Sequence, residues 1–202
     1  MEEPSSLPGL PFPLRWRPTP ERWHVADDGR LSITAGAGTD LFADPRGGAP
    51  AVDAPRLLGS PPVGDFQLSA RVTVGFATTF DAGVLLVHAD DRRWAKLCFE
   101  RSPQDEALVV SVVTRGVSDD ANAFAVAGRQ VWLRISRLGP AYAFHASEDG
   151  TSWRFVRLFA LEAAGDVAVG FLAQSPTGAG CTAVFDRVFY RTERLPDLRS
   201  GV

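Results

Sequence analysis

Residues 93–100, with the sequence RWAKLCFE, have the alternating pattern of a β-strand. Successive side chains of a β-strand point to opposite faces of its sheet, so the stretch divides into two sets. The first set, which is apolar and suits a core, consists of Ala95, Leu97 and Phe99, and the second consists of Trp94, Lys96, Cys98 and Glu100. One apolar face and one mixed face are typical of an antiparallel sheet that packs against a second layer.

The rest of the chain shows the same strand-like pattern. From about Trp23 onward, short runs of β-branched and aromatic residues are separated by Gly, Pro, Asp and Asn. No segment sustains a helical period over three turns. We therefore predict an all-β sandwich with strands at residues 30–36, 66–75, 83–89, 93–100, 107–114, 131–138, 141–147, 153–158, 166–173 and 181–190.

We expect a single domain with two appendages. A chain of 202 residues is long enough to bury a core without metal or disulfide staples. Six prolines within residues 1–20 disfavour a helix and indicate an extended arm. We divide the chain into a proline-rich N-terminal arm at 1–22, a β-sandwich domain at 23–192 and a C-terminal tail at 193–202, which we expect to fray.

Composition and charge exclude several classes of protein. The chain is 45% hydrophobic with a net charge of −3, so it lacks the basic surface that binds nucleic acid. No run approaches the roughly 18 apolar residues of a membrane span. The acidic, proline-containing start MEEPSSLPGLPF does not resemble a secretory signal. We expect a cytoplasmic protein with no membrane or nucleic-acid partner and with Cys98 and Cys181 reduced.

Nine short motifs, in order along nearly the full chain, resemble the DUF1349 family, also called the regulation-of-enolase protein 1 family. They lie at residues 12–16 (FPLRW), 38–42 (GTDLF), 64–66 (GDF), 80–86 (FDAGVLL), 94–96 (WAK), 111–114 (SVVT), 131–134 (VWLR), 147–150 (SEDG) and 170–178. One difference from the family is visible. Asp119 is followed by Asp120, where family members tend to have an aromatic residue.

The resemblance implies a fold and a place for a ligand. The expected fold is a concanavalin A-like jelly roll of two antiparallel sheets, with the concave side of one sheet as the usual place for a carbohydrate or peptide ligand. The family's name derives from a fungal member linked to the control of a glycolytic enzyme, so a glycolytic enzyme is a candidate protein partner. Function does not follow from the fold alone.

The mixed face of residues 93–100 is the predicted ligand site. Charges on a partly buried face are costly unless paired, so we expect Arg134 to pair with Glu100 and an aspartate to pair with Lys96. Trp94 would stack on a sugar or another flat ligand. The predicted ligand-binding residues are Trp94, Lys96, Glu100, Arg134, Asp40, Asp119, Thr114 and Asp81. The alternative is a purely structural polar network that holds the curvature of the sheet.

Catalysis has weaker support than binding. A retaining glycosidase needs two carboxylates about 5–5.5 Å apart, but the same-face neighbours of Glu100 along its strand are Cys98 and Ser102. A second acid would come from a loop residue such as Asp40, Asp81 or Asp119. A nucleophile elbow is absent from the sequence, and so is a glycine-rich phosphate loop.

We therefore predict a non-catalytic binding or interaction module with no metal and no cofactor. Its ligand would be a glycan, a sugar phosphate or a partner protein. The alternative is a carbohydrate-active hydrolase with a non-standard carboxylate pair.

Overall fold

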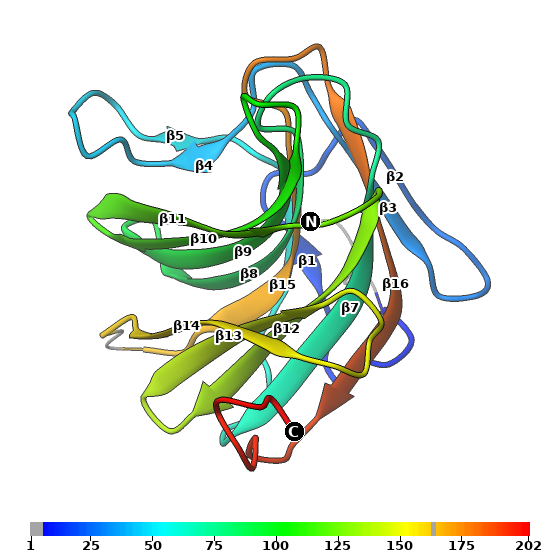
Figure 1. Ribbon diagram of the computed structural model, residues 1–202, viewed down its shortest axis with the longest axis vertical. Coiled ribbons are helices and arrows are strands. Elements are labelled where there is room, and N and C mark those ends of the chain that lie inside the picture. The colour runs from blue at the N-terminus through cyan, green and yellow to red at the C-terminus, as the bar shows by residue number, and fades with distance from the viewer. Residues whose placement is uncertain (1–5, 163–164) are drawn as a thin grey trace.

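Two seven-stranded antiparallel sheets form a jelly-roll sandwich (Figure 1). The computed structural model describes residues 6–162 and 165–202. Sheet I has the strand order β1 (Arg15–Trp16), β6 (Arg56–Gly59), β15 (Ala168–Gln174), β8 (Ala82–Asp90), β9 (Arg93–Arg101), β10 (Ala107–Arg115) and β11 (Val117–Ala125). Sheet II has the order β14 (Arg154–Ala160), β13 (Ala141–Ser147), β12 (Gln130–Leu138), β7 (Phe66–Val74), β16 (Cys181–Arg191), β3 (Leu31–Ala35) and β2 (Arg22–Val25). A small ribbon pairs β4 (Leu41–Phe42) with β5 (Ala51–Val52).

The main core lies between the two sheets. Leu97 and Phe99 of β9 are fully buried there, in one apolar cluster with residues of sheet II such as Ile135. The rings of Phe171 on β15 and Phe185 on β16 lie 5.0 Å apart across the sandwich. The alternation along residues 93–100 therefore predicted correctly that Ala95, Leu97 and Phe99 face the main core.

A second apolar cluster lies on the outer face of sheet I. It includes Trp94, Val84 and Cys98 from the strands, together with Leu41 and Ala54. The last two belong to the covering segment, residues 39–55, which carries β4 and β5. Figure 1 shows that β8–β11 curve and that β4 and β5 project over their hollow side. Most of this face is therefore covered rather than open to water.

All ten predicted strands are present, with ends within two residues of the predicted ones. Strand β11 was not predicted from the sequence, and neither were the shorter strands β1, β2, β4, β5 and β6. Strand β11 reads VSDDANAFA, and its charged and small residues lack an apolar face. No helix among the described residues is long and apolar enough to cross a membrane.

The N-terminal arm packs on its own domain over the residues that the structure describes. Leu7, Phe12 and Leu14 are buried in the main core. Strand β1 pairs with β6 of sheet I through Arg15 and Trp16. Residues 1–5 lie outside the described part of the chain.

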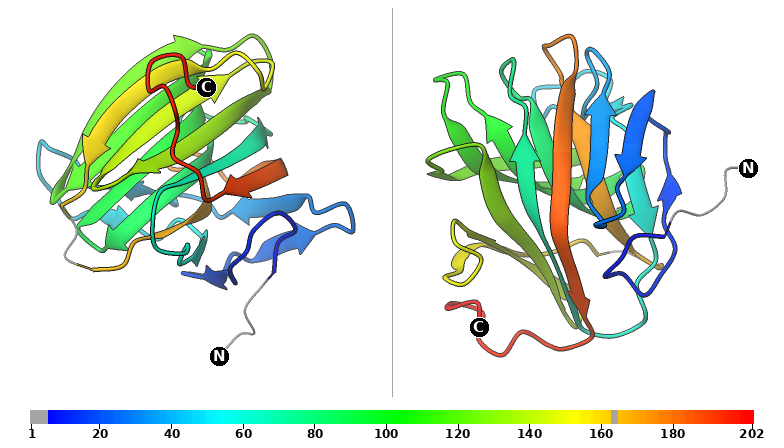
Figure 2. Two further views of the ribbon diagram at one scale, coloured as in Figure 1. Left: turned by 90° about the horizontal axis from the view of Figure 1, so that it is seen from below. Right: turned by 90° about the vertical axis from the view of Figure 1, so that its right-hand side faces the viewer.

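The C-terminal tail does not fray, contrary to the sequence-based expectation. It folds back across the outer face of sheet II, as the left view of Figure 2 shows. Leu195 is buried, and Nε2 of His145 on β13 lies 2.8 Å from the carbonyl oxygen of Leu198. The tail stays in place because it supplies hydrogen-bond partners to polar side chains of sheet II.

Candidate functional site

A cavity of about 370 Å³ lies over the hollow side of sheet I, beside the covering segment. Lys96 on β9 is in register with Val112 on β10, which is in register with Asp120 on β11, so the three side chains share one face. The lining residues on which the site is built are Asp40, Phe42, Phe80, Lys96, Glu100, Asp120 and Gln174.

Lys96 is a buried and fully paired cation, with only 2% of its surface exposed. Its Nζ lies 3.4 Å from Oδ1 of Asp40 and donates a hydrogen bond of 2.9 Å to Oε1 of Gln174. The ammonium also lies 5.8 Å from the centre of the Phe42 ring. Burial lowers the pKa of Lys96, but Asp40 and Glu100 outweigh that effect, and the net pKa lies above its usual value. Lys96 therefore stays charged and organises its neighbours.

Glu100 differs from Lys96 because its carboxyl group has no partner. Its neighbours in register are Ala82 on β8 and Leu108 on β10, and no described residue forms a hydrogen bond or ion pair with it. Burial raises the pKa of Glu100 to about 8, and the net effect of nearby charges does not reverse the rise. At pH 7 roughly nine in ten of these carboxyl groups are protonated. The side chain can therefore donate one hydrogen bond and accept others.

Asp120 adds a second carboxyl group from β11. Partial burial raises its pKa, and the neighbouring Asp119 adds to the rise while Lys96 opposes it. The sequence analysis did not place Asp120 in the site because it did not predict β11. The register of β11 with β10 and β9 identifies Asp120 in the structure, and the sequence of β11 carries no apolar alternation that could have revealed it.

Phe80 stands beside the cavity in a strained backbone conformation. Its φ is 69°, a left-handed value that a bulky residue rarely adopts, and 38% of its surface is exposed. Its N–H donates to the carbonyl of Arg101 at 2.7 Å, and its own carbonyl accepts from Nε2 of Gln174 at 3.3 Å. Strain of this kind persists only where surrounding contacts enforce it, which is common at binding sites.

Asp81, a predicted ligand-binding residue, is buried next to Phe80 and does not line the cavity. Its carboxylate accepts hydrogen bonds of 2.8 Å from the N–H groups of Ala77 and Thr78 and one of 2.7 Å from Oγ of Ser175. These bonds tie the loop before β8 to the end of β15. Asp81 therefore positions Phe80.

Trp94 and Thr114 lie on the predicted face but beneath the covering segment. Trp94 is 1% exposed, so its ring offers no open surface on which a sugar could stack. Thr114 shares a hydrogen bond of 2.8 Å with Oγ of Ser118, which accepts another of 3.0 Å from the N–H of Ala43. Both residues hold the covering segment in place, which corrects the expectation that they contact a ligand.

Arg134 and Asp119 lie away from the cavity. Arg134 is on the outer face of sheet II, where it donates to the carbonyl of Gly201 and lies 4.0 Å from the ring of Trp153. The expected pair with Glu100 is therefore wrong. Asp119 points away from Asp120 and forms an ion pair of 3.1 Å with Arg157 on β14. The cavity brings together three of the predicted residues, Asp40, Lys96 and Glu100.

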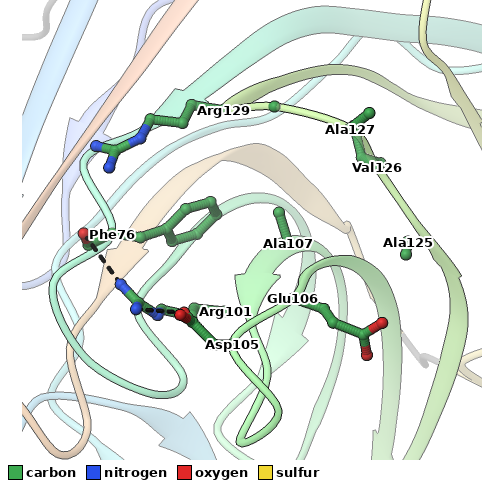
Figure 3. A pocket seen from close by; sticks show the side chains of 10 residues that line it. Phe76, Arg101, Asp105, Glu106, Ala107, Ala125, Val126, Ala127 and Arg129 are labelled. Atoms are coloured by element: carbon green, nitrogen blue, oxygen red, sulfur yellow. Dashed lines mark hydrogen bonds and ion pairs between the residues drawn. The ribbon is translucent and has the colours of Figure 1, made fainter.

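A larger cavity of about 650 Å³ lies at the end of the sandwich near the turn between β9 and β10 (Figure 3). Of its charged residues, Arg101 forms an ion pair with Asp105 and lies 3.5 Å from the carbonyl oxygen of Phe76, and Glu106 and Arg129 are exposed to solvent. Within the described residues, no group of three or more His, Cys, Asp or Glu side chains is arranged to hold a metal ion. The cavity over Glu100 is therefore the better candidate site.

Comparisons with known proteins agree on the fold. A family model described as a protein of unknown function (DUF1349) matches residues 16–193. No curated protein is a significant match to the chain. A functionally unknown protein from Saccharomyces cerevisiae is 22% identical with a TM-score of 0.79, and the match covers 89% of this chain and 96% of that one.

Two further solved structures carry names connected with carbohydrates. The GH43B protein of the xyloglucan PUL of Bacteroides ovatus is 17% identical with a TM-score of 0.72, over 96% of this chain and 40% of that one. An alginate lyase from Klebsiella pneumoniae is 13% identical with a TM-score of 0.58, over 85% of this chain and 84% of that one. The chain spans less than half the length of the GH43B protein.

Proposed function

The chain belongs to the DUF1349 family, and on that basis we propose that it is a non-catalytic binding module that takes a carbohydrate-like ligand over Lys96 and Glu100. One observation carries the proposal. The cavity on the hollow side of sheet I contains a partly buried carboxyl group, that of Glu100, which no described residue binds. A polar group of this kind is costly inside a protein unless it finds a partner, and a ligand hydroxyl would be that partner.

The composition of the cavity supports a sugar-like ligand. Sugars present hydroxyl groups at their edges and C–H groups on their faces. Asp120, Glu100 and Asp40 provide oxygen atoms for the hydroxyl groups, and Phe42 and Phe80 provide apolar surface for the faces. About 370 Å³ is near the lower end of the ~300–1,000 Å³ range of small-molecule sites, which suits one or two sugar rings.

The comparisons support the choice of carbohydrates as the first ligands to test. A GH43 protein and an alginate lyase share the fold, but their identities of 17% and 13% carry no residue-level argument. The activity of the longer GH43 protein is therefore not transferred to this chain.

The test is a matched pair of variants in neighbouring positions. Asp119 and Asp120 are adjacent, but only Asp120 lines the cavity. We expect neutral mono- and disaccharides to raise the melting temperature and to bind in calorimetry. Asp120→Asn should weaken that binding about five- to tenfold through a poorer hydrogen bond. Asp119→Asn frees Arg157 but removes no group from the cavity lining, so it should weaken binding much less. Equal effects of the two substitutions would contradict the site, and a panel of sugars without binding would contradict the function.

A hydrolase is the second candidate, because one observation favours it. The raised pKa of Glu100 keeps it protonated at neutral pH, as a general acid must be, and the carboxyl groups of Asp120 and Asp40 line the same cavity. The discriminating measurement is chromatography of neutral oligosaccharides after long incubation with the protein. Released product that Glu100→Gln abolishes would favour the hydrolase, whereas binding without turnover favours the module.

A protein partner such as a glycolytic enzyme is the remaining candidate. Co-purification of the tagged chain with enolase is its direct test. An Asp120→Asn variant that retained enolase would place any such contact outside the cavity.

A further inference from the structure

The cations that line the cavity are already neutralised by carboxylates. Nζ of Lys96 lies 3.4 Å from Asp40, and Arg46 forms an ion pair of 2.6 Å with Asp44. Lys96 is also buried to 98%, so it cannot turn toward a second anion without breaking the first pair. Lys96 is therefore not free to bind an acidic ligand, and Arg46, an exposed side chain, has Asp44 as a competing partner.

The groups that remain are acidic. Asp120 forms no ion pair with a described residue, because Arg157, the cation of sheet II that acts on it, is paired with Asp119 at 3.1 Å. Glu100 likewise has no ionic partner at hydrogen-bond distance. The lining holds four acidic side chains, Asp40, Asp44, Glu100 and Asp120, against the two cations Arg46 and Lys96. A carboxylate or phosphate entering the cavity would therefore meet a net excess of acidic groups, which costs free energy through repulsion and desolvation.

We propose that the cavity selects uncharged, polyhydroxylated ligands, such as a neutral mono- or disaccharide, and rejects acidic sugars and sugar phosphates. This inference rests on the function proposed above and narrows its ligand class. The protonated carboxyl group of Glu100 donates one hydrogen bond to a ligand oxygen and accepts one from a ligand hydroxyl. Asp120 accepts a second hydroxyl, and the aromatic rings of Phe42 and Phe80 contact the C–H groups of the sugar.

Binding should consequently depend on the protonation of Glu100. The charged groups that face it are Lys96 on its own strand, Asp120 on β11 and Asp40 before β4, while β8 and β10 present Ala82 and Leu108. When Glu100 loses its proton, the cavity loses a donor and gains a negative charge beside Asp120. Affinity for a neutral sugar should therefore fall as the pH rises through about 8, the pKa of Glu100.

The experiment measures affinity by calorimetry at constant ionic strength between pH 6 and pH 9. The probes are xylobiose and cellobiose, which are neutral, and digalacturonate, which is acidic. We expect digalacturonate to bind at least tenfold more weakly than the neutral disaccharides at pH 6.5. The affinity of the neutral probe should fall about fivefold from pH 7 to pH 9. Glu100→Gln should remove this pH dependence, and the control Glu106→Gln, at an exposed position outside the cavity, should keep it.

Each outcome separates the inference from the proposed function. Digalacturonate binding as tightly as the neutral sugars, or a flat pH profile in the wild type, would overturn the inference and leave the binding module intact. If no sugar of either charge binds, the proposed function fails and the inference fails with it. If Glu100→Gln does not fold, Asp120→Asn is the second variant. Removing the charge of Asp120 should strengthen digalacturonate binding several-fold. An unchanged affinity for digalacturonate would contradict the repulsion on which the inference depends.

Discussion

The outer faces of the two sheets make an instructive comparison. On sheet II, Arg134 and His145 are covered by the C-terminal tail, whose carbonyl groups at Gly201 and Leu198 bind them. On sheet I, the covering segment binds Lys96 through Asp40 but leaves the carboxyl group of Glu100 in a cavity.

Similar arrangements of charged and aromatic side chains have different roles on the two outer faces. Both faces place charged side chains among aromatic ones, and both are covered by a segment without long strands. Burial lowers the pKa of His145 to about 4 and that of Arg134 to about 10, and it raises the pKa of Glu100 to about 8. Arg134 and His145 each bind a carbonyl group of the tail and are sealed beneath it, although Nε of Arg134 and Nδ1 of His145 make no hydrogen bond. Glu100 instead lies in a cavity that a ligand can enter. A ligand is therefore expected on sheet I and not on sheet II.

Gly201→Val should have the largest effect on stability. Gly201 has a φ of 75°, and an added Cβ would lie 2.7 Å from Trp153 and 2.8 Å from Arg134. We expect the variant to lose about 3 kcal/mol of unfolding free energy in urea, because the tail must leave its place. Gly139→Val is the matched control, since Gly139 has a φ of 63° and open space around it, and it should lose only about 1 kcal/mol. Sugar affinity of the folded protein should not change in either variant. Equal losses would mean that the tail contributes nothing at Gly201.

Lys96→Met should destabilise the fold less, by about 2 kcal/mol. The substitution removes a buried ammonium and leaves Asp40 without its partner, although Asp40 keeps some access to water. Urea unfolding gives the loss, and calorimetry with xylobiose should show weaker binding because Asp40 and Gln174 lose their common anchor. A variant as stable as the wild type would show that the pair does not organise the site.

Glu100→Gln should change the pH dependence of stability. The pKa of Glu100 is about 8 in the folded protein and about 4.5 when unfolded, so the folded state holds more protons between these values. Stability should therefore fall as the pH rises from 4.5 to 8, by at most about 1.4 kcal/mol per pH unit, and level off above 8. Relative to the wild type, we expect the variant to gain nothing at pH 4.5 and progressively more stability up to pH 8.5 in denaturant unfolding. A constant difference at all pH values would contradict the raised pKa.

Phe80→Asn should have the smallest effect on stability and a clear effect on binding. Asparagine tolerates the left-handed backbone, so the relief of strain offsets the lost packing to within about 0.5 kcal/mol. Affinity for xylobiose should fall about fivefold because the apolar surface beside the cavity is lost. Unchanged affinity would remove Phe80 from the site.

The alternation along residues 93–100 was sufficient to place Lys96 and Glu100 on one face, because a strand has only two faces. It could not say which sheet Arg134 belongs to, since β12 has the same alternation and faces outward on the opposite side of the sandwich. The burial of Trp94 depends on the covering segment, whose position results from contacts between residues such as Ala43 and Ser118 that are 75 positions apart.

Two further features of the site, Asp120 and Phe80, could not be predicted from the sequence. Asp120 lies on β11, which pairs with β10 along its length but has too few apolar residues to be recognised as a strand. Phe80 adopts a conformation that local preference disfavours, and the hydrogen bonds around Asp81 enforce it. Sequence patterns report local preference, so they miss elements that distant contacts impose.

The most direct test of the difference between the two faces is a crystal structure of the protein grown at pH 6.5 with saturating xylobiose. We predict a sugar in the cavity of sheet I, with a hydroxyl group within hydrogen-bond distance of Glu100 and the C-terminal tail unchanged. Two results would contradict this prediction. One is a sugar bound to the outer face of sheet II, and the other is an empty cavity under conditions in which xylobiose binds in solution.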